Sequence, residues 1–359
     1  MKSKRDTLSK RERVLRTLNL QPVDRVATHD YIHNPRVLSL YSEPADMHRT
    51  VRETLDLWRP MDPISSNGGT AEDGFELDAP QGWTDWITRY PFEDLPGLKE
   101  YILRDTDRIR ARAAAFDPGK ERNERRRQLL GHIQSVGDDT VMMELDHTPL
   151  RDCLWRAGIE LFSYLLYDEP DTIHEWLKVY LAHQLQIIDA VADRELAPVV
   201  LIANEIASSD APLLNPEFLR SALFPDVGQL IDVWHRHGIK VILEIQGNSR
   251  ELIPPFIECG ADGFYAIEAI AGMDIVELKN RYPRCVWACG VDGANLMTFG
   301  TPQQVEAEVL RQIQCTDALR TGGLFIGSSS EINPPIEPEI FKTMIDVARS
   351  VRNEDFSVG

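Results

Sequence analysis

The segment Lys240-Val-Ile-Leu-Glu-Ile-Gln-Gly-Asn248 has the pattern of a buried strand that ends in polar residues. Glu244 and Gln246 are two positions apart, so their side chains leave the same face of the strand, and Leu243 and Ile245 leave the opposite face. If the apolar face packs against helices, Glu244 points into the interior of a sheet or barrel. A buried carboxylate needs a partner, a proton or a metal ion. We therefore expect a functional group here; a structural hydrogen bond or ion pair is the alternative.

Similar apolar segments occur on both sides of this one and alternate with helical segments. The predicted strands are residues 25–29, 61–66, 140–145, 198–203, 240–245, 262–267, 285–289 and 322–327. Strands rich in Val and Ile that are separated by helices indicate a parallel sheet. Eight such units predict the α/β class and a (β/α)8 TIM barrel. An open doubly wound sheet is the alternative, and the lack of a glycine-rich phosphate motif after the first strand disfavours it.

One stretch departs from the alternation. We expect a single barrel domain over residues 1–359, with an inserted loop and helical region at 67–135 that is first rich in Gly, Asp and Pro and then highly charged. The remaining predicted helices include 46–58, 149–166, 170–194, 216–237, 249–259, 273–281, 302–320 and 337–352.

Net charge disfavours some classes of binding partner, and the cysteine content indicates the redox compartment. The 359 residues hold 57 acidic and 39 basic side chains, a formal charge of −18, which disfavours binding to nucleic acid or to anionic membranes. No apolar run is long enough to cross a membrane, and no apolar segment follows the basic N-terminus as in a secretory signal. The odd number of cysteines, five, predicts reduced thiols and a cytoplasmic protein.

The segments after the predicted strands are the candidate functional regions, because catalytic residues of such barrels lie at the C-terminal strand ends. They supply the acids Glu205, Glu244, Glu268, Asp292 and Glu331. Each alone is typical of a loop cap, and Asp292 fits an Asx-turn. Together they predict a negative pocket, suited to a cation, a divalent metal or a general acid with a raised pKa.

The candidate residues follow from this pattern. Glu244, Glu205 and Asp292 are the catalytic candidates, and Glu244, Glu205 and His147 are the candidate metal ligands. Polar residues at the same strand ends would orient a substrate, and aromatic side chains would form a wall, with core packing as the alternative for each aromatic. These residues are Gln246, Asn248, Asn204, Glu268, Ser328, Tyr31, Trp83, Trp86 and Tyr265.

Several motifs together resemble the uroporphyrinogen decarboxylase superfamily. They span most of the chain and include Arg11-Glu-Arg-Val-Leu15, Pro22-Val-Asp-Arg-Val26, Tyr90-Pro-Phe-Glu-Asp-Leu95, Asn215-Pro-Glu-Phe-Leu-Arg220, His237-Gly to Gly247-Asn248, Cys259-Gly-Ala-Asp-Gly263, Gly290-Val-Asp292, Gly300-Thr-Pro-Gln-Gln-Val305 and Gly327-Ser-Ser-Ser-Glu-Ile332. The resemblance implies a (β/α)8 barrel. One branch of this superfamily decarboxylates a tetrapyrrole without a cofactor, and the other moves methyl groups to or from a corrinoid on a partner protein.

The resemblance is closer to the methyltransferase branch. The arginine-rich N-terminal signature and the Phe-Ser-Asp segment of the decarboxylases are not found in the sequence. Methyltransferases often carry His-x-Cys after strand five and a Cys after strand eight, which bind zinc that activates a thiol. Glu244, Gln246 and Ser328 stand at those places, so the resemblance implies a component that demethylates a donor, with zinc as an open question.

Three functions follow from this combination. The first is a methyltransferase that moves a methyl group from a methoxylated aromatic or N-methylated small molecule to the cobalt of a partner corrinoid protein. In it, Glu244 serves as general acid or metal ligand. The second is a decarboxylase that needs no cofactor. The third is a binding barrel without catalysis. A homodimer is an open alternative to a monomer.

Overall fold

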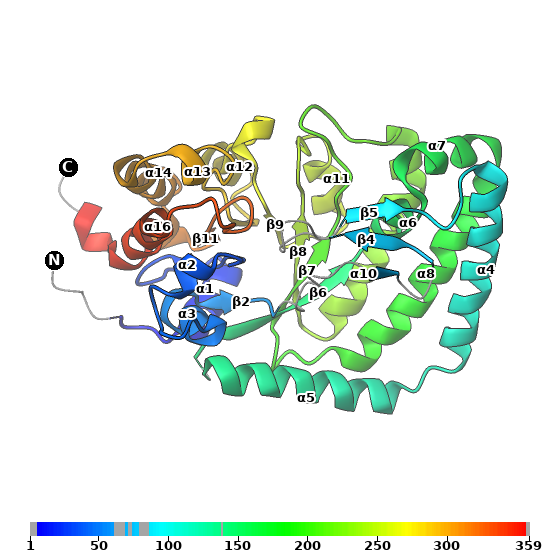
Figure 1. Cartoon of the computed structure of the whole chain (residues 1–359). Helices are drawn as coiled ribbons and strands as arrows, with labels where there is room; N and C mark the ends of the chain where they lie inside the picture. The colour runs from blue at the N-terminus through cyan, green and yellow to red at the C-terminus, as the bar shows by residue number, and fades with distance from the viewer. Residues whose placement is uncertain (1–5, 61–68, 71–73, 79–85, 138, 357–359) are drawn as a thin grey trace.

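Eight parallel strands form the centre of the molecule. The computed structural model describes residues 6–60, 69–70, 74–78, 86–137 and 139–356. Within them the strand order is β1-β11-β10-β9-β8-β7-β6-β2, a nearly closed barrel that confirms the predicted (β/α)8 fold (Figure 1). The strands are β1 (Ala27–Thr28), β2 (Leu57–Trp58), β6 (Val141–His147), β7 (Val199–Ala203), β8 (Lys240–Glu244), β9 (Gly263–Tyr265), β10 (Val286–Ala288) and β11 (Leu324–Ile326).

Helices surround the barrel on all sides visible in Figure 1. The first begins after Ser9, whose side chain accepts a hydrogen bond from the backbone N–H of Glu12, as a helix N-cap does. The helices are α1 (Lys10–Leu18), α2 (Pro35–Leu38), α3 (Met47–Thr54), α6 (Pro149–Ala157), α7 (Ile159–Asp168), α8 (Pro170–Val191), α9 (Pro216–Phe218), α10 (Phe224–Arg236), α11 (Ile253–Glu258), α12 (Ile275–Arg281), α13 (Leu296–Phe299), α14 (Pro302–Cys315), α15 (Ala318–Thr321) and α16 (Pro338–Ser350).

The second barrel strand corrects the sequence prediction. It is Leu57–Trp58, within the segment predicted as a helix, and α3 ends earlier, at Thr54. Residues 61–66, the predicted strand, lie outside the described residues. A strand of two residues has no measurable period, so hydrophobic alternation could not identify it. The predicted helix 216–237 is also interrupted, by the π-helical turn η1 (Leu219–Leu223).

Asp56 links β1 and β2, the two strands at the ends of the strand order. Its backbone N–H donates to the carbonyl of Thr28 (3.0 Å), and its carboxylate accepts from the N–H of Thr28 (3.1 Å). The same carboxylate is buried and accepts hydrogen bonds from the guanidinium groups of Arg25 (2.7 and 2.9 Å) and Arg13 (2.9 Å). This charged cluster satisfies backbone groups that β1 and β2 do not pair directly.

The region inserted before β6 contains a small sheet and two long helices. Strands β3 (Gly69–Thr70), β4 (Glu76–Asp78) and β5 (Trp86–Arg89) are antiparallel. Helix α4 (Leu95–Ala114) lies beside α8, and α5 (Pro118–Val136) crosses the bottom of the view in Figure 1 and returns the chain to β6. The later, highly charged part of the inserted region is therefore helical, as the sequence predicts.

Two apolar clusters divide the core. Val241, Leu243 and Ile245 belong to the cluster between the barrel and its helices, whereas Ile242 belongs to the cluster inside the barrel. Strand alternation thus places Glu244 and Gln246 on the inward face, as the sequence predicts.

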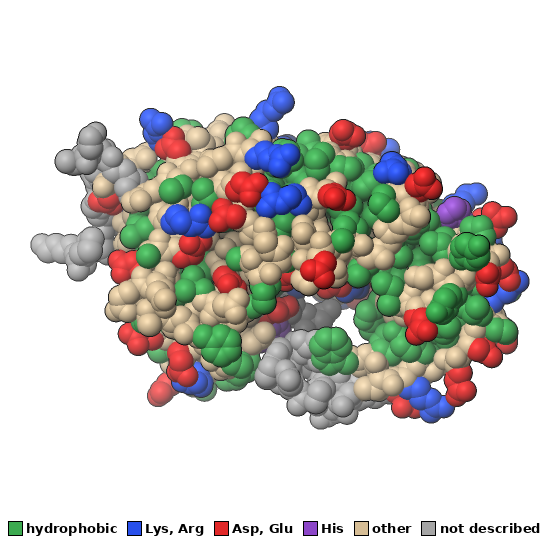
Figure 2. All heavy atoms as spheres, turned by 90° about the horizontal axis from the view of Figure 1, so that it is seen from above, with side chains coloured by type: hydrophobic (Ala, Val, Ile, Leu, Met, Phe, Trp, Pro, Cys, Tyr) green, Lys and Arg blue, Asp and Glu red, His purple; other side chains and the backbone are tan. Residues whose placement is uncertain are grey.

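Charge on the surface is mixed. In the view of Figure 2, acidic and basic side chains alternate, and hydrophobic side chains gather toward the right-hand end. Among the described helices, none combines the length and apolar character that crossing a bilayer requires.

Candidate active site at the C-terminal end of the barrel

Glu244 is the central acid of the barrel mouth, the C-terminal end of the strands. It ends β8 next to Tyr265 of β9, with which it is in register. Its Oε1 accepts a hydrogen bond from Nε2 of Gln246 (2.6 Å). Burial raises the pKa of Glu244 to about 7; the negative charge of Glu205 adds to this, and the Gln246 hydrogen bond and the charge of Arg59 oppose it. A carboxyl group with this pKa exchanges its proton near neutral pH.

An aromatic cluster adjoins Glu244. The rings of Tyr31 and Tyr265 meet edge to face at 5.6 Å, and His29 lies 5.2 Å from the first and 5.6 Å from the second. The guanidinium of Arg59 lies 4.3 Å above the Tyr31 ring, and its Nε donates to the Tyr31 hydroxyl (2.6 Å). Both tyrosines are buried, which raises their pKa values and keeps them neutral.

His29 is a neutral base inside this cluster. Burial lowers the pKa of His29 to about 4. Its Nδ1 lies 3.1 Å from the carbonyl of Leu57, and because a carbonyl only accepts, Nδ1 carries the proton. Its Nε2 is buried and has no hydrogen-bond partner among the described residues. This nitrogen is therefore an unused hydrogen-bond acceptor in the interior of the cluster.

Asp30 is a second buried acid that the sequence interpretation did not single out. Its two oxygens accept backbone N–H groups, from Tyr31 (2.9 Å) and from Ser328 (3.0 Å). Burial nevertheless raises the pKa of Asp30 well above its usual range. The predicted Ser328 is fully buried beside it, so its backbone holds Asp30 in place.

Glu205 and His147 are held by other partners. Arg151 donates from Nε to Glu205 (3.1 Å) at the exposed edge of the mouth. Nδ1 of His147 lies 3.2 Å from Asp152. Glu205 still acts on Glu244 through its charge, but both side chains have local ion-pair partners.

Three further candidates stabilise loops. Asp292 accepts from the backbone and side chain of Asn295 (3.0 and 3.2 Å), the Asx-type arrangement weighed above. Glu268 accepts from the backbone N–H of Gly247 (2.8 Å), and Asn248 donates to the carbonyl of Asp210 (3.1 Å). The contacts of Glu268 and Asn248 fix the loop after β8, which carries Gln246.

The last candidates differ in their surroundings. Asn204 is buried and accepts from the hydroxyl of Thr148 (3.0 Å), and its Nδ2 has no partner among the described residues. Trp83 lies outside the described residues, and Trp86 on β5 is exposed, 63 % of its surface being accessible.

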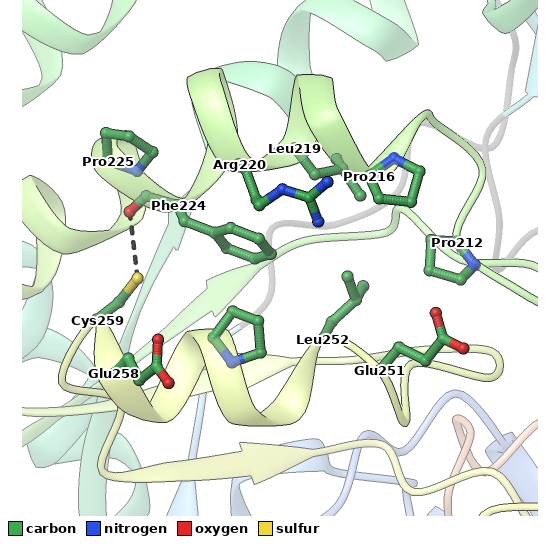
Figure 3. Close-up of a pocket in the computed structure, with 11 residues that line it drawn as sticks. Pro212, Pro216, Leu219, Arg220, Phe224, Pro225, Glu251, Leu252, Glu258 and Cys259 are labelled. Atoms are coloured by element: carbon green, nitrogen blue, oxygen red, sulfur yellow. Dashed lines mark hydrogen bonds between the residues drawn. The ribbon is translucent and has the colours of Figure 1, made fainter.

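A cavity of about 430 Å³ lies away from the barrel mouth, between the start of α10 and helix α11 (Figure 3). Its wall is mainly proline, leucine and phenylalanine, and Arg220, Glu251 and Glu258 also line it. The thiol of Cys259 donates to the carbonyl of Phe224 (3.2 Å), and burial raises the pKa of this thiol, so it is a poor nucleophile. The acids and bases suited to catalysis are at the mouth instead.

Comparison with known proteins places this barrel in a family. The sequence profile described as uroporphyrinogen decarboxylase (URO-D) matches residues 155–351, more than half of the chain. The chain belongs to the uroporphyrinogen decarboxylase family. This confirms the resemblance seen in the motifs, and the matched residues contain β8 with Glu244. A search among curated proteins found no match.

One solved structure shares the family's barrel over nearly the whole chain. It is a methyltransferase from Methanosarcina mazei, with a TM-score of 0.66 and 16% sequence identity, covering 98% of this chain and 100% of that one. At this identity the likeness establishes the fold.

The residues of this family member do not fit the expected metal site. Among the described ranges, no three His, Cys, Asp or Glu side chains are grouped as ligands of one ion. Of the expected ligands, Glu205 pairs with Arg151 and His147 with Asp152, which leaves Glu244 without a second ligand.

Arg59 and Asp30 are the functional residues that sequence reasoning missed. Arg59 follows the two-residue strand β2, which was interpreted as the end of a helix. Asp30 directly follows the first predicted strand, and its position at a strand end was the signal that could have identified it. Where the sequence predicts a negative pocket, the structure adds the positive charge of Arg59 and pairs Glu205 with Arg151.

Proposed function

We propose that this protein transfers a methyl group from a methoxylated aromatic or N-methylated small molecule to the cobalt of a corrinoid held by a partner protein. The observation that supports this most is the state of Glu244: inward, half-buried, with a pKa of about 7 and bound only by Gln246 among the described side chains. The family and the fold shared with a methyltransferase are consistent with it.

The reaction needs an acid because an ether oxygen is a poor leaving group. The corrinoid would supply the nucleophile that accepts the methyl group. As the bond between methyl carbon and oxygen breaks, its electron pair stays on the oxygen, and Glu244 donates its proton to that oxygen. Since Gln246 donates to Oε1, the transferable proton sits on Oε2. The resulting carboxylate is then stabilised by the nearby charge of Arg59.

The aromatic cluster positions the substrate in this proposal. Tyr31 and Tyr265 are buried edge to face beside Glu244, and Nε2 of His29 is the unused acceptor of the same cluster. Such a largely apolar wall with few polar groups excludes water from the leaving oxygen and orients the ligand.

Cofactor-free decarboxylation is the second candidate, and Asp30 favours it. A buried acid with a strongly raised pKa can protonate the carbanion left when carbon dioxide departs. In that reaction the bond to the carboxyl carbon breaks, the electron pair stays on the substrate carbon, and Asp30 supplies the proton.

The test uses the purified full chain with free cob(I)alamin in place of the partner. Methoxylated aromatics and methylated amines are added, and loss of the cob(I)alamin absorption is followed. Donor-dependent loss that disappears in Glu244→Gln supports the proposal. Release of carbon dioxide from an added carboxylated substrate, without cob(I)alamin, favours the second candidate. Absence of both activities favours a binding barrel.

A further inference from the structure

A second cavity, which we call the arginine pocket, opens beside the barrel mouth. It has a volume of about 420 Å³, within the range of small-molecule sites, and a mostly polar wall. The described residues that line it are Arg59, Pro60, Arg125, Gln128, Leu129, His132, Met143, Glu144 and Leu145.

The cavity lies where two neighbouring strands, as described, end at different heights. Strand β2 pairs with β6 as far as Trp58 and Met142, whereas β6 continues to His147. No described strand lies beside residues 143–145 on the β2 side. Helix α5 covers this gap with one face, since its lining residues recur at helical spacing from Arg125 to His132.

Two guanidinium groups in the pocket have donors to spare. Within the described residues, Arg59 makes one hydrogen bond, from Nε to the Tyr31 hydroxyl, and no carboxylate lies within ion-pair distance of it. Within the same residues, Arg125 has a single ionic contact, to Glu144 at 3.7 Å, which is too long for a hydrogen bond. Burial raises the pKa of Glu144, and its Oε1 has no hydrogen-bond partner among the described residues.

The charge of this wall is unusual for the protein. In a chain with a formal charge of −18, the pocket holds two arginines against one acid. Even with Glu144 ionised, one arginine charge is uncompensated within the described wall. Such a site attracts an anion, and a planar carboxylate fits the fork of a guanidinium best.

Arg59 joins this pocket to the proposed reaction. It lines the cavity and also lies above Tyr31, in the cluster beside Glu244. Its charge acts on Glu244 directly. A ligand bound in the pocket by the remaining donors of Arg59 would therefore lie next to the cluster that adjoins the acid.

We infer that the substrate carries a carboxylate, bound by Arg59 and Arg125 in the arginine pocket, while its methyl-bearing group lies toward Glu244. This inference rests on the proposed function only in placing the carboxylate and the methyl-bearing group on one molecule. A singly charged carboxylate suits the pocket better than a phosphate dianion, because Glu144 would repel a second negative charge.

The test measures binding, so it needs neither a corrinoid nor turnover. Isothermal titration calorimetry of the full chain compares 4-methoxybenzoate with 4-methoxybenzamide, which has nearly the same shape and no charge. We expect the carboxylate to bind at least about tenfold more tightly, and Arg59→Ala or Arg125→Ala to remove most of that preference, because each loses a charge-assisted hydrogen bond.

The matched control is Arg127→Ala. Arg127 is also on α5, is exposed, pairs with Glu124 and does not line the pocket, so its removal should leave both affinities unchanged. The preference should also weaken as salt screens the charges. Equal affinity for the two compounds, no saturable binding of either, or variants that bind like the wild type would overturn the inference. Displacement by inorganic phosphate more effective than by benzoate would overturn the carboxylate assignment.

The two proposals fail in different ways. If Glu244→Gln abolishes methyl transfer and the arginine variants bind 4-methoxybenzoate normally, the function stands and the carboxylate pocket is wrong. If the carboxylate binds through both arginines and no methyl transfer occurs with any donor, the pocket stands and the methyltransferase proposal is wrong.

Discussion

Gln246 donates a 2.6 Å hydrogen bond to Glu244 from the next inward position of the same chain segment. The bond occupies one carboxyl oxygen and leaves the other for a proton. Because Gln246 carries no charge, it holds the carboxyl group in place without forcing it to ionise, unlike an arginine or lysine partner. A pKa of about 7 follows from that choice of partner together with burial.

Replacing Glu244 by Gln should reduce methyl transfer by about 10²- to 10⁴-fold, the usual contribution of a general acid. The amide has nearly the same shape and cannot donate the proton, so circular dichroism and the unfolding temperature should change little. Rates with cob(I)alamin and a methoxylated donor provide the measurement. Gln246→Ala is the comparison: it keeps the acid and should have a smaller effect. Equal rates for wild type and Glu244→Gln would rule out the acid role.

The rate should fall as pH rises through about 7, because only protonated Glu244 can donate. The direction is set by the raised pKa: the acid form predominates below that value and is lost above it. Glu205→Gln should move the falling limb to lower pH, since the charge of Glu205 raises the pKa of Glu244. Arg59→Ala should move it to higher pH, since the charge of Arg59 lowers that pKa. If neither variant shifts the pH dependence of kcat/KM, this electrostatic account is wrong.

Asp30→Asn distinguishes the two candidate reactions. If Asp30 protonates a carbanion, the variant should lose carbon dioxide release by about 10²-fold or more. If Glu244 acts as the acid in methyl transfer, the same variant should lose much less methyl transfer activity. The side-chain N–H₂ of the variant would face one of the two backbone N–H groups that now donate to Asp30. Two donors cannot pair, so we expect some loss of folding stability. Thermal unfolding of the variant, measured in parallel, separates that effect from a chemical role.

Asp56→Asn should destabilise the barrel by about 3–5 kcal/mol at neutral pH, because it leaves Arg13 and Arg25 buried without their counter-charge. The pKa of Asp56 is lowered on folding, chiefly by the charge of Arg25 against the opposing effect of burial. Its contribution is therefore present above the unfolded-state pKa of about 4 and is lost as pH falls below it. Urea unfolding of the wild type should show this loss in acid, and the variant should show less of it. Asp346→Asn, at an exposed pair with Lys342, serves as the control and should change little.

The sequence was most informative where structure is set by local period. Alternation along residues 240–246 was enough to turn Glu244 and Gln246 inward, because successive side chains of a strand leave opposite faces. The repeated order of strand and helix likewise predicted the barrel, since parallel strands require helical crossovers. Strand β2 has only two residues, so its period could not be recognised in the sequence. The position of Arg59, which directly follows it, could not be predicted either.

The barrel strands, the family motifs and the inward acid of β8 can each be predicted from the sequence, because each depends on residues close together in the chain. The surroundings of that acid depend on the fold. Arg59 meets Tyr31 across 28 positions, and Arg151 binds Glu205 across 54. These long-range contacts depend on which strands are neighbours and on where each strand ends. A local sequence pattern contains no information on them, so the charge balance at the barrel mouth could be established only from the folded chain.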